Sequence, residues 1–133
     1  MTGHIETVVL DCAGLSAWVA HDRTVAAMLQ VFSELESDLV VSANTIIEVS
    51  HPGVNIARLS WVLSRVKIEP VTAQTAKASA KLLKEAKLHG HKHAIDATVA
   101  EAALRQPRPV AMLTSDVDDM SKLCGTQVQM IAV

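Results

Sequence analysis

Aromatic residues are scarce in this chain of 133 residues, and it has no long apolar run and no large excess of either charge. Tyr is absent, Phe occurs once and Trp twice, so the core must be built from aliphatic side chains and Met. The net charge of -2 excludes a protein that binds nucleic acid through bulk electrostatic attraction. No apolar run approaches a membrane span, and the first residues lack the basic and apolar regions of a signal peptide. We therefore expect a cytoplasmic protein without a membrane segment.

Cysteine is also rare, since Cys12 and Cys124 are the only two. Neither belongs to a C-x-x-C pair of the kind that holds a metal, so we expect both to be reduced, with a disulfide as the less favoured alternative. Cys12 directly follows Asp11, which makes a nucleophilic role an alternative. No His stands beside Cys12 in the sequence, so a small core residue is the favoured interpretation.

The residues that are present suffice for one globular domain. Hydrophobic residues make up 50% of the chain and charged residues 20%, a balance typical of folded proteins. A chain of this length can bury a sizeable core as a single domain. No internal repeat, linker or low-complexity segment divides it. We expect a single domain over residues 1–133.

Short apolar runs alternate with amphipathic segments along the whole chain. We predict strands at 6–11, 38–42, 67–71, 110–114 and 127–133. We predict helical segments at 15–19, 22–35, 43–49, 56–66, 73–89, 93–105 and 117–123, with Gly90 closing the fifth of them. Such alternation predicts an α/β fold with a mostly parallel five-stranded sheet covered on both faces. Pro70, near the end of the third strand, predicts that this strand lies at a sheet edge.

Four acidic residues fall where predicted strands end or helices begin. Asp11 ends the first strand, and Glu48 lies in the helix after the second strand. Asp96 falls in the first turn of a helix, and Asp116 follows the fourth strand. Ligands collect outside the carboxyl ends of strands in open α/β sheets, so we expect the four acids near one edge. Each has an ordinary alternative, because Asp favours helix N-termini and Glu48 can be an exposed helix acid.

If these carboxylates converge, they repel one another and need a counter-charge. A set of carboxylate oxygens and water suits Mg²⁺ or Mn²⁺. Such an ion lowers the pKa of bound water and neutralises charge on a phosphodiester. Phosphodiester hydrolysis is therefore the reaction class that the acids favour.

Four short segments carry a resemblance to a known family. They are Val9-Leu10-Asp11, Glu48 after Ser42-Ala43-Asn44, His93-Ala94-Ile95-Asp96-Ala97, and Leu113-Thr114-Ser115-Asp116-Val117-Asp118-Asp119-Met120. In order and spacing the chain resembles the PIN-domain ribonucleases, in particular the small VapC-type toxins of bacterial toxin-antitoxin pairs. The resemblance covers essentially the whole chain. It implies a metal-dependent endoribonuclease with a three-layer α/β/α PIN-like fold and the sheet order 3-2-1-4-5.

The resemblance also implies roles for individual residues. The implied catalytic and metal-binding residues are Asp11, Glu48, Asp96 and Asp116. Asp119 or Asp118 is the implied accessory acid, with Asp119 included among the metal ligands, and Thr114 or Ser115 orients the carboxylates. RNA is the implied substrate. Family members are commonly homodimers that a small antitoxin protein inhibits by filling the acidic site.

The chain departs from the family pattern directly after the first acid. Cys12 stands where many relatives carry a hydroxyl residue, which affects how water is positioned at the metal. The scarcity of aromatics removes base-stacking platforms, so substrate selection is expected to rest on shape and phosphate contacts. The candidate phosphate-contacting residues are Lys92, Arg105, Arg108 and the helical lysine stripe Lys77, Lys81, Lys84 and Lys87.

Two further groups of residues have structural interpretations that we favour. His89, His91 and His93 alternate at a predicted helix boundary, where side chains point apart, so we favour a His-rich loop near the RNA site over a metal cluster. Trp18 and Trp61 each fall in an apolar helical stretch, so we expect packing or a dimer interface there.

Two alternative functions remain open at this point. One is a phosphoacceptor domain of the receiver type, which shares this length, alternation and acidic pocket. Receiver domains need paired acids after the first strand and an Asp after the third, whereas Asp11 has no acidic neighbour and Val71 follows Pro70. The other is a catalytically silent PIN-like module that binds a partner, against which only the full acid set argues.

Overall fold

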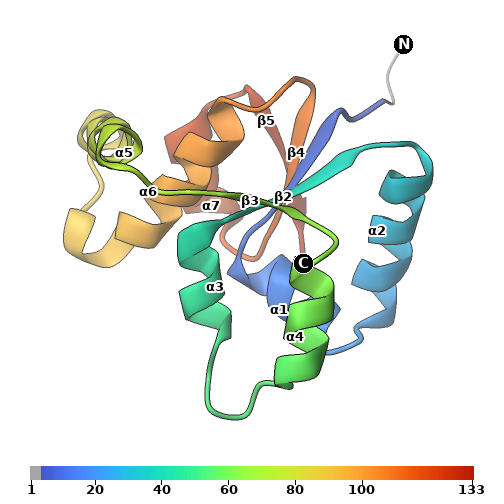
Figure 1. The fold of residues 1–133 in the computed structure, drawn as a ribbon. Helices are drawn as coiled ribbons and strands as arrows, with labels where there is room; N and C mark the ends of the chain where they lie inside the picture. The colour runs from blue at the N-terminus through green and yellow to red at the C-terminus, as the bar shows by residue number, and fades with distance from the viewer. Residues whose placement is uncertain (1–3) are drawn as a thin grey trace.

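Strands and helices alternate through residues 4–133, the part of the chain that this computed structural model describes (Figure 1). The strands are β1 (Thr7–Leu10), β2 (Asp38–Ser42), β3 (Lys67–Glu69), β4 (Val110–Thr114) and β5 (Val128–Ala132). The helices are α1 (Cys12–Val19), α2 (Arg23–Glu34), α3 (Ala43–Val49), α4 (Ile56–Leu63), α5 (Ala73–Ala86), α6 (Gly90–Leu104) and α7 (Val117–Cys124). Residues 1–3, where we looked for the start of a signal peptide, lie outside the described part.

The five strands pair in parallel in the order β3-β2-β1-β4-β5, which confirms the predicted sheet. It also confirms that β3 lies at an edge. Receiver domains have the flavodoxin-like order 2-1-3-4-5, in which β1 and β3 are neighbours. The observed order therefore removes the receiver alternative.

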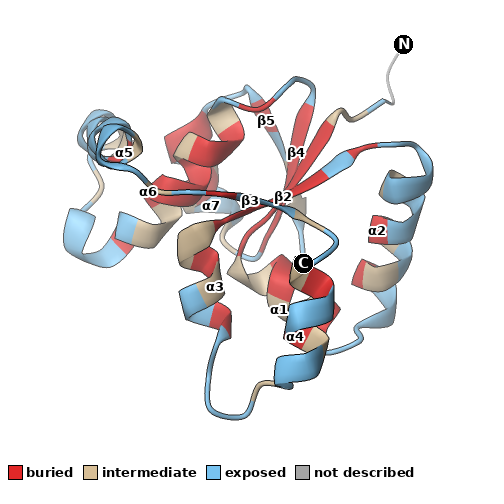
Figure 2. Cartoon of the chain, viewed as in Figure 1, coloured by how far each residue is buried: buried red, intermediate tan, exposed pale blue. Residues whose placement is uncertain are grey.

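Both faces of the sheet are buried because successive strand residues point into different cores. Val8 and Leu10 pack in one core with α1, α2 and α4, while Val9 packs in the other with α6 and α7. Figures 1 and 2 show these two helical layers on opposite sides of the sheet, with the buried residues concentrated on the strands. The continuous apolar runs in the sequence follow from this double coverage.

The direction of the crossovers reverses at the centre of the sheet. The chain leaves β1 through α1 and α2 to β2, and through α3 and α4 to β3. It then crosses to the far side of β1, where β4 and β5 lie. The carboxyl ends of β1 and β4 thus flank a switch point, the usual place for a ligand in an open α/β sheet.

The α5–α6 boundary differs from the sequence prediction. Gly90 does not close the fifth helix, because α5 already ends at Ala86 with Lys87 in the left-handed conformation, at φ 58°. Gly90 instead begins α6, which is kinked at His93, where φ is -116° and ψ is 19°. The chain therefore enters α6 three residues earlier than predicted and bends at the histidine.

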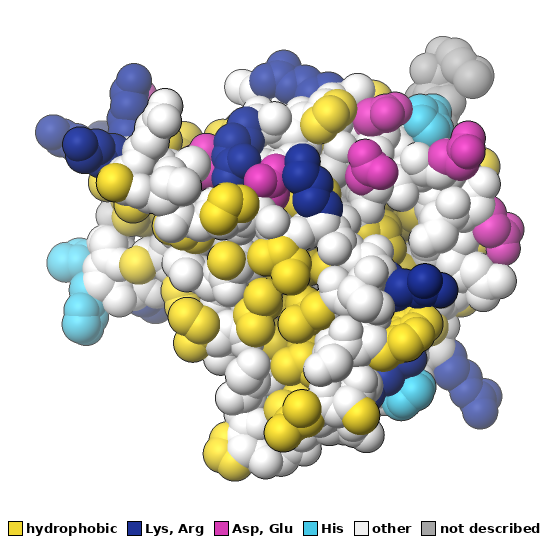
Figure 3. Space-filling model, viewed as in Figure 1, with side chains coloured by type: hydrophobic (Ala, Val, Ile, Leu, Met, Phe, Trp, Pro, Cys, Tyr) yellow, Lys and Arg dark blue, Asp and Glu magenta, His cyan; other side chains and the backbone are white. Residues whose placement is uncertain are grey.

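The surface over α3 and α4 is apolar, whereas the outer face of α5 is basic. In Figure 3 hydrophobic side chains gather over α3 and α4, and Lys and Arg side chains extend from the region of α5. Ile47 and Ile56 are 71% and 75% exposed. The lysine stripe on α5 is exposed, as a solvated helix face would be. Among residues 4–133, no helix combines the length and apolar character needed to traverse a bilayer.

The two tryptophans contact each other beside a groove between α2 and α4. Trp18 is buried, Trp61 is 45% exposed, and their rings pack edge to face with centroids 6.0 Å apart. The Arg58 and Arg65 guanidinium groups lie 4.6 and 5.2 Å from the Trp61 ring centroid. Trp18 thus has the packing role that we predicted.

Candidate metal centre

Pairing of β1 with β4 brings two acid-bearing segments together although they are distant in sequence. Leu10 is in register with Leu113, and the Asp11 backbone N–H donates to the Leu113 carbonyl at 3.0 Å. Asp11 therefore leaves β1 directly beside Thr114, the last residue of β4. Asp116 follows as the N-cap of α7. The switch point of the sheet carries two of the predicted acids.

The Asp11 carboxylate is buried and fixed through both of its oxygens. The Thr114 hydroxyl donates to Asp11 Oδ2 at 2.8 Å, and the Cys12 backbone N–H donates to Oδ1 at 2.7 Å. Thr114 Oγ1 in turn accepts the Asp116 backbone N–H at 2.9 Å. Thr114 thus orients Asp11, whereas Ser115 is exposed and has no side-chain hydrogen bond within the described residues.

A glycine allows α1 to begin so close to β4. A Cβ on Gly14 would lie 3.0 Å from Leu113 Cβ and 3.2 Å from the Leu113 carbonyl oxygen. These separations are shorter than ordinary contacts, so a side chain there would push α1 away from the sheet. The small residue therefore helps to place Asp11 at the first turn of α1.

Three side chains from α6 and α7 form the tightest group at this edge. His93 Nδ1 lies 3.2 Å from Asp96 Oδ2 and 3.7 Å from Asp119 Oδ2. Among residues 4–133, these are the side chains whose ligand atoms all lie within 4.8 Å of one another. The other Asp119 oxygen, Oδ1, is 3.9 Å from the partly exposed Lys122 ammonium.

Mutual repulsion links the remaining acids to this group. Burial raises the pKa of Asp11 despite the hydrogen bonds from Thr114 and Cys12, and the charge of Asp96 adds to the rise. Burial also raises the pKa of Asp116, followed by the charges of Asp119, Asp96 and Asp11, with His93 acting in the opposite direction. The carboxylates are therefore near neighbours with too little positive charge among them.

Glu48, on α3, is the remaining acid that interacts with this group. The residue is exposed, although Ile46, Ile47 and Val49 beside it are apolar. Partial desolvation of its carboxylate raises its pKa, and the charges of Asp11 and Asp96 add to this. Asp118 differs from these acids, because it is exposed and forms no ion pair or side-chain hydrogen bond within the described residues. Of the two alternative accessory acids, Asp119 is the one that faces the group.

Helix capping does not account for Asp116. It occupies the N-cap position of α7, but its side chain accepts no capping hydrogen bond. Asp22 and Thr72, by contrast, each accept a backbone N–H at the start of their helices. The Asp116 carboxylate is therefore free to turn toward the other acids.

Cys12 lacks the properties of a nucleophile. Burial raises the pKa of its thiol, and the charges of Glu48, Asp11 and Asp96 raise it further, with only Ser16 opposing. The thiolate, which is the reactive form, is therefore disfavoured. Burial raises the pKa of Cys124 to about 12, and both cysteines are free, as predicted.

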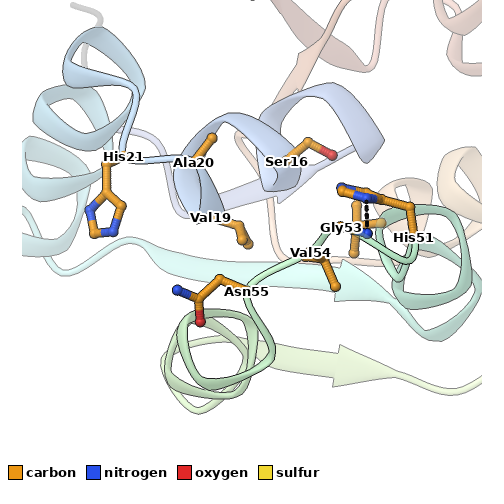
Figure 4. Close-up of a pocket in the computed structure, with 9 residues that line it drawn as sticks. Ser16, Val19, Ala20, His21, His51, Gly53, Val54 and Asn55 are labelled. Atoms are coloured by element: carbon orange, nitrogen blue, oxygen red, sulfur yellow. Dashed lines mark hydrogen bonds between the residues drawn. The ribbon is translucent and has the colours of Figure 1, made fainter.

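A cleft of about 310 Å³ lies between α1 and the loop from α3 to α4. Ser16, one turn after Cys12, and Val49, which follows Glu48, both line it. Figure 4 shows His51 turned back toward its own loop, where its Nδ1 accepts the Gly53 N–H at 3.1 Å. None of the candidate acids lines the cleft, so it is a feature separate from the acidic group.

Two of the candidate phosphate-contacting residues are held by other side chains. Arg105 pairs with Glu101 at 2.9 Å and with Glu69 at 3.0 Å, and Arg108 donates a hydrogen bond to Gln127. We correct the prediction for these two residues, because their guanidinium groups are already paired within the protein. Lys92 is exposed and lies on α6 beside His93, so it keeps its place as a candidate.

The donor set fits a divalent cation. Each Asp11 oxygen accepts one hydrogen bond and keeps a lone pair, and the carboxylates of Asp96, Asp116 and Asp119 are only partly buried. Positive charge among these acids would relieve the repulsion that contributes to the raised pKa values of Asp11 and Asp116. Mostly hard oxygen donors at a partly open edge are the ligands that Mg²⁺ and Mn²⁺ take.

Comparison with known proteins shows the fold. No protein-family model and no curated protein matches the sequence. A chain of the Rickettsia felis VapBC2 complex, whose crystal structure includes a DNA fragment from the promoter, superposes with a TM-score of 0.71. It shares 15% identity and covers 96% of this chain and 98% of its own. The fold is PIN-like. A chain of FitAcB from Neisseria gonorrhoeae shares this PIN-like fold with a TM-score of 0.59, 18% identity, and coverage of 93% and 96%.

His93 is the residue at this edge that sequence reasoning set aside. Alternating histidines were expected to point apart, and His89 and His91 are indeed exposed. The kink at His93 turns its ring inward, where it meets Asp96 three residues later and Asp119 from another helix. The pair His93 and Asp96 was a detectable signal, because residues three apart share a helix face.

Proposed function

We propose that this protein is a metal-dependent endoribonuclease and the toxin of a toxin-antitoxin pair. The observation that supports this is the convergence of five carboxylates at the switch point of a PIN-like sheet. They are Asp11, Glu48, Asp96, Asp116 and Asp119. The charge of Asp96 contributes to the raised pKa values of Asp11, Glu48 and Asp116, and the charge of Asp119 contributes to that of Asp116.

In this proposal Asp11, Glu48, Asp96, Asp116 and Asp119 hold Mg²⁺ or Mn²⁺. When bound, the ion lowers the pKa of water and neutralises charge on the scissile phosphodiester. The protein's own part is positioning. Thr114 fixes the direction of the Asp11 carboxylate, and the backbone N–H of Asp116 fixes Thr114, so one hydroxyl links Asp11 to the start of α7.

RNA is the substrate that we propose for this edge. Because the site is acidic, a bound cation must neutralise the charge of the phosphate backbone. Lys92, which is exposed on α6, is our candidate for contact with a neighbouring phosphate. The chain's few aromatics are consistent with recognition by shape rather than by stacking.

We also propose a small antitoxin partner and a homodimer. The two solved structures with this fold, VapBC2 and FitAcB, support a protein partner, and we propose that this partner covers the acidic edge. Exposed apolar side chains over α3 and α4 supply a surface for association (Figure 3). Light scattering of the purified protein, alone and with its partner, measures both assemblies.

The decisive experiment is cleavage of a mixed cellular RNA pool by purified protein with Mg²⁺, with Mn²⁺ and with EDTA. We expect cleavage with either metal and none with EDTA. Asp96→Asn should reduce the cleavage rate at least about 100-fold, because it removes a metal ligand while keeping the shape of the side chain. Asp38→Asn is the matched control, since Asp38 is exposed at the opposite edge of the sheet.

A catalytically silent PIN-like binding module is the competing function. It predicts no metal-dependent cleavage from a folded, antitoxin-free sample, with RNA or antitoxin binding retained. Equal cleavage by wild type and Asp96→Asn would instead remove Asp96 from the site and point to a contaminating nuclease.

A further inference from the structure

An imidazole lies inside the otherwise acidic group at the sheet edge. The His93 side chain is only 9% exposed, and its Nδ1 lies 3.2 Å from Asp96 Oδ2 and 3.7 Å from Asp119 Oδ2. The proposed nuclease centre needs only oxygen ligands, so it gives His93 no role. A buried His between two carboxylates therefore needs its own explanation.

Backbone geometry directs this ring into the group. The residue departs from helical φ and ψ inside α6, and its N–H still donates to the His89 carbonyl at 2.9 Å. The regular part of α6 begins after the kink and places Asp96 on the same side, while α7 brings Asp119 from a separate segment. Two helices thus hold the imidazole in place, unlike the exposed His89 and His91 nearby.

The separations match those between ligands of one metal ion. Adjacent ligands lie about 3.0 Å apart around an octahedral ion and about 3.4 Å apart around a tetrahedral one, for bonds of about 2.1 Å. The two distances from Nδ1, 3.2 and 3.7 Å, fall near this range before any ion draws the groups together. In the structure Nδ1 forms a hydrogen bond with Asp96 Oδ2, and an ion takes the place of this hydrogen bond in the tautomer that carries its proton on Nε2, which leaves a free lone pair on Nδ1.

We propose that His93 is a nitrogen ligand which, with Asp96 and Asp119, makes the centre bind Mn²⁺ in preference to Mg²⁺. This inference rests on the proposed metal centre and specifies which cation the centre takes. Mg²⁺ is a hard ion that is bound through carboxylates, phosphates and water, whereas imidazole suits first-row transition metals. One nitrogen among carboxylates therefore shifts selectivity without removing affinity for a hard ion.

Metal binding without RNA tests the inference. Mn²⁺ is titrated into metal-free protein and followed by electron paramagnetic resonance, and Mg²⁺ affinity is measured by competition. We expect wild type to bind Mn²⁺ at least about tenfold more tightly than Mg²⁺. The pulsed spectrum of bound Mn²⁺ should show coupling to an imidazole ¹⁴N nucleus.

His93→Gln should lose the ¹⁴N coupling and weaken Mn²⁺ binding at least about tenfold, with a smaller change for Mg²⁺. His91→Gln is the matched control, because it removes an exposed imidazole two residues away and should change neither quantity. Circular dichroism checks the fold of both variants. The wild-type spectrum decides whether nitrogen is bound even if His93→Gln does not fold.

Failure of this inference can be separated from failure of the proposed function. Binding of Mn²⁺ without ¹⁴N coupling, or equal affinities for Mn²⁺ and Mg²⁺, would overturn the role of His93 and leave an all-oxygen nuclease centre intact. Binding of neither ion by folded wild-type protein would overturn the metal centre itself, and the proposed nuclease with it.

Discussion

Two acidic sites at the same edge of the sheet have opposite electrostatics. Glu69 ends β3, and its carboxylate lies 3.0 Å from Arg105, 3.3 Å from Lys67 and 2.5 Å from the Gln106 amide. Burial opposes its ionisation, but the hydrogen bonds from Gln106 and Arg105 and the charge of Arg105 outweigh burial and lower its pKa. At the ends of β1 and β4, by contrast, the pKa values of Asp11 and Asp116 are raised.

The difference lies in the partners of these acids and not in their position. Parallel strands deliver side chains to the same edge, so placement there is common to Glu69 and Asp11. The cations around Glu69 come from β3 and the end of α6. They neutralise the charge of the Glu69 carboxylate within the protein, so no ligand is needed to do so. Within residues 4–133, the acids around Asp11 have only His93 and Lys122 as partners of this kind. Their negative charge is therefore not neutralised within the protein.

The largest effect should separate two neighbouring acids on α7. Asp119→Asn should reduce RNA cleavage at least about 100-fold, because Asp119 faces His93 and Asp96, whereas Asp118→Asn should cleave at the wild-type rate. The measurement is the initial rate of RNA cleavage at saturating Mn²⁺. Equal losses in the two variants would place the metal nearer to the start of α7 than we infer.

The next effect concerns stability at the paired site. Glu69→Ala should lower the free energy of unfolding by about 2 kcal/mol, since charge-assisted hydrogen bonds are lost while Arg105 keeps Glu101. Urea unfolding measures this. Glu85→Ala, at an exposed position on α5, should change the free energy by no more than about 0.5 kcal/mol.

The pH dependence of this effect has a definite sign. The folded-state pKa of Glu69 lies below its ordinary value of about 4.3, so its stabilisation is fully present above that pH. It is lost as the pH falls through the folded-state pKa. Glu69→Gln should therefore flatten the acid limb of the stability curve, and an unchanged limb would contradict the pairing.

The smallest predicted effect is a gain in stability rather than a loss. Asp116→Asn should raise the free energy of unfolding of metal-free protein by about 1 kcal/mol at neutral pH, because it relieves repulsion and removes no capping hydrogen bond. Because the folded-state pKa is raised, this gain should vanish below about pH 3.9, where the unfolded state is also protonated. Thermal unfolding in EDTA is the measurement, and a destabilised variant would contradict the repulsion.

Much of the fold could be predicted because local patterns and long-range packing agree. The strands at 38–42 and 110–114 have the predicted bounds, since both faces of β2 and β4 are buried and their apolar runs end sharply. Asp22 begins α2 by the hydrogen bond that its side chain predicts. The predicted end of α5 was wrong, because Lys87 adopts a left-handed conformation and closes the helix before Gly90.

The site was less predictable because its contacts join segments that lie far apart. Sequence placed Asp11 and Asp116 at strand ends, but only the register of β1 and β4 sets Thr114 against Asp11. The His93 ring points inward because α6 is kinked at this residue, and no residue type near it predicts a kink. Arg105 looked available for phosphate, and its pairing with Glu69 depends on β3 lying beside α6.

The acids come together at the edge of the sheet only after β1 has paired with β4. Thr114 and Asp11 are 103 residues apart, and β4 is the neighbour that brings Asp116 and Asp119 to the first acid. While the chain is being synthesised, β1 can pair with β2 long before β4 has left the ribosome. Until β4 and α7 follow, Asp11 lies at the end of β1 without Thr114, Asp116 and Asp119. The proposed nuclease activity would therefore arise only after most of the chain has been synthesised.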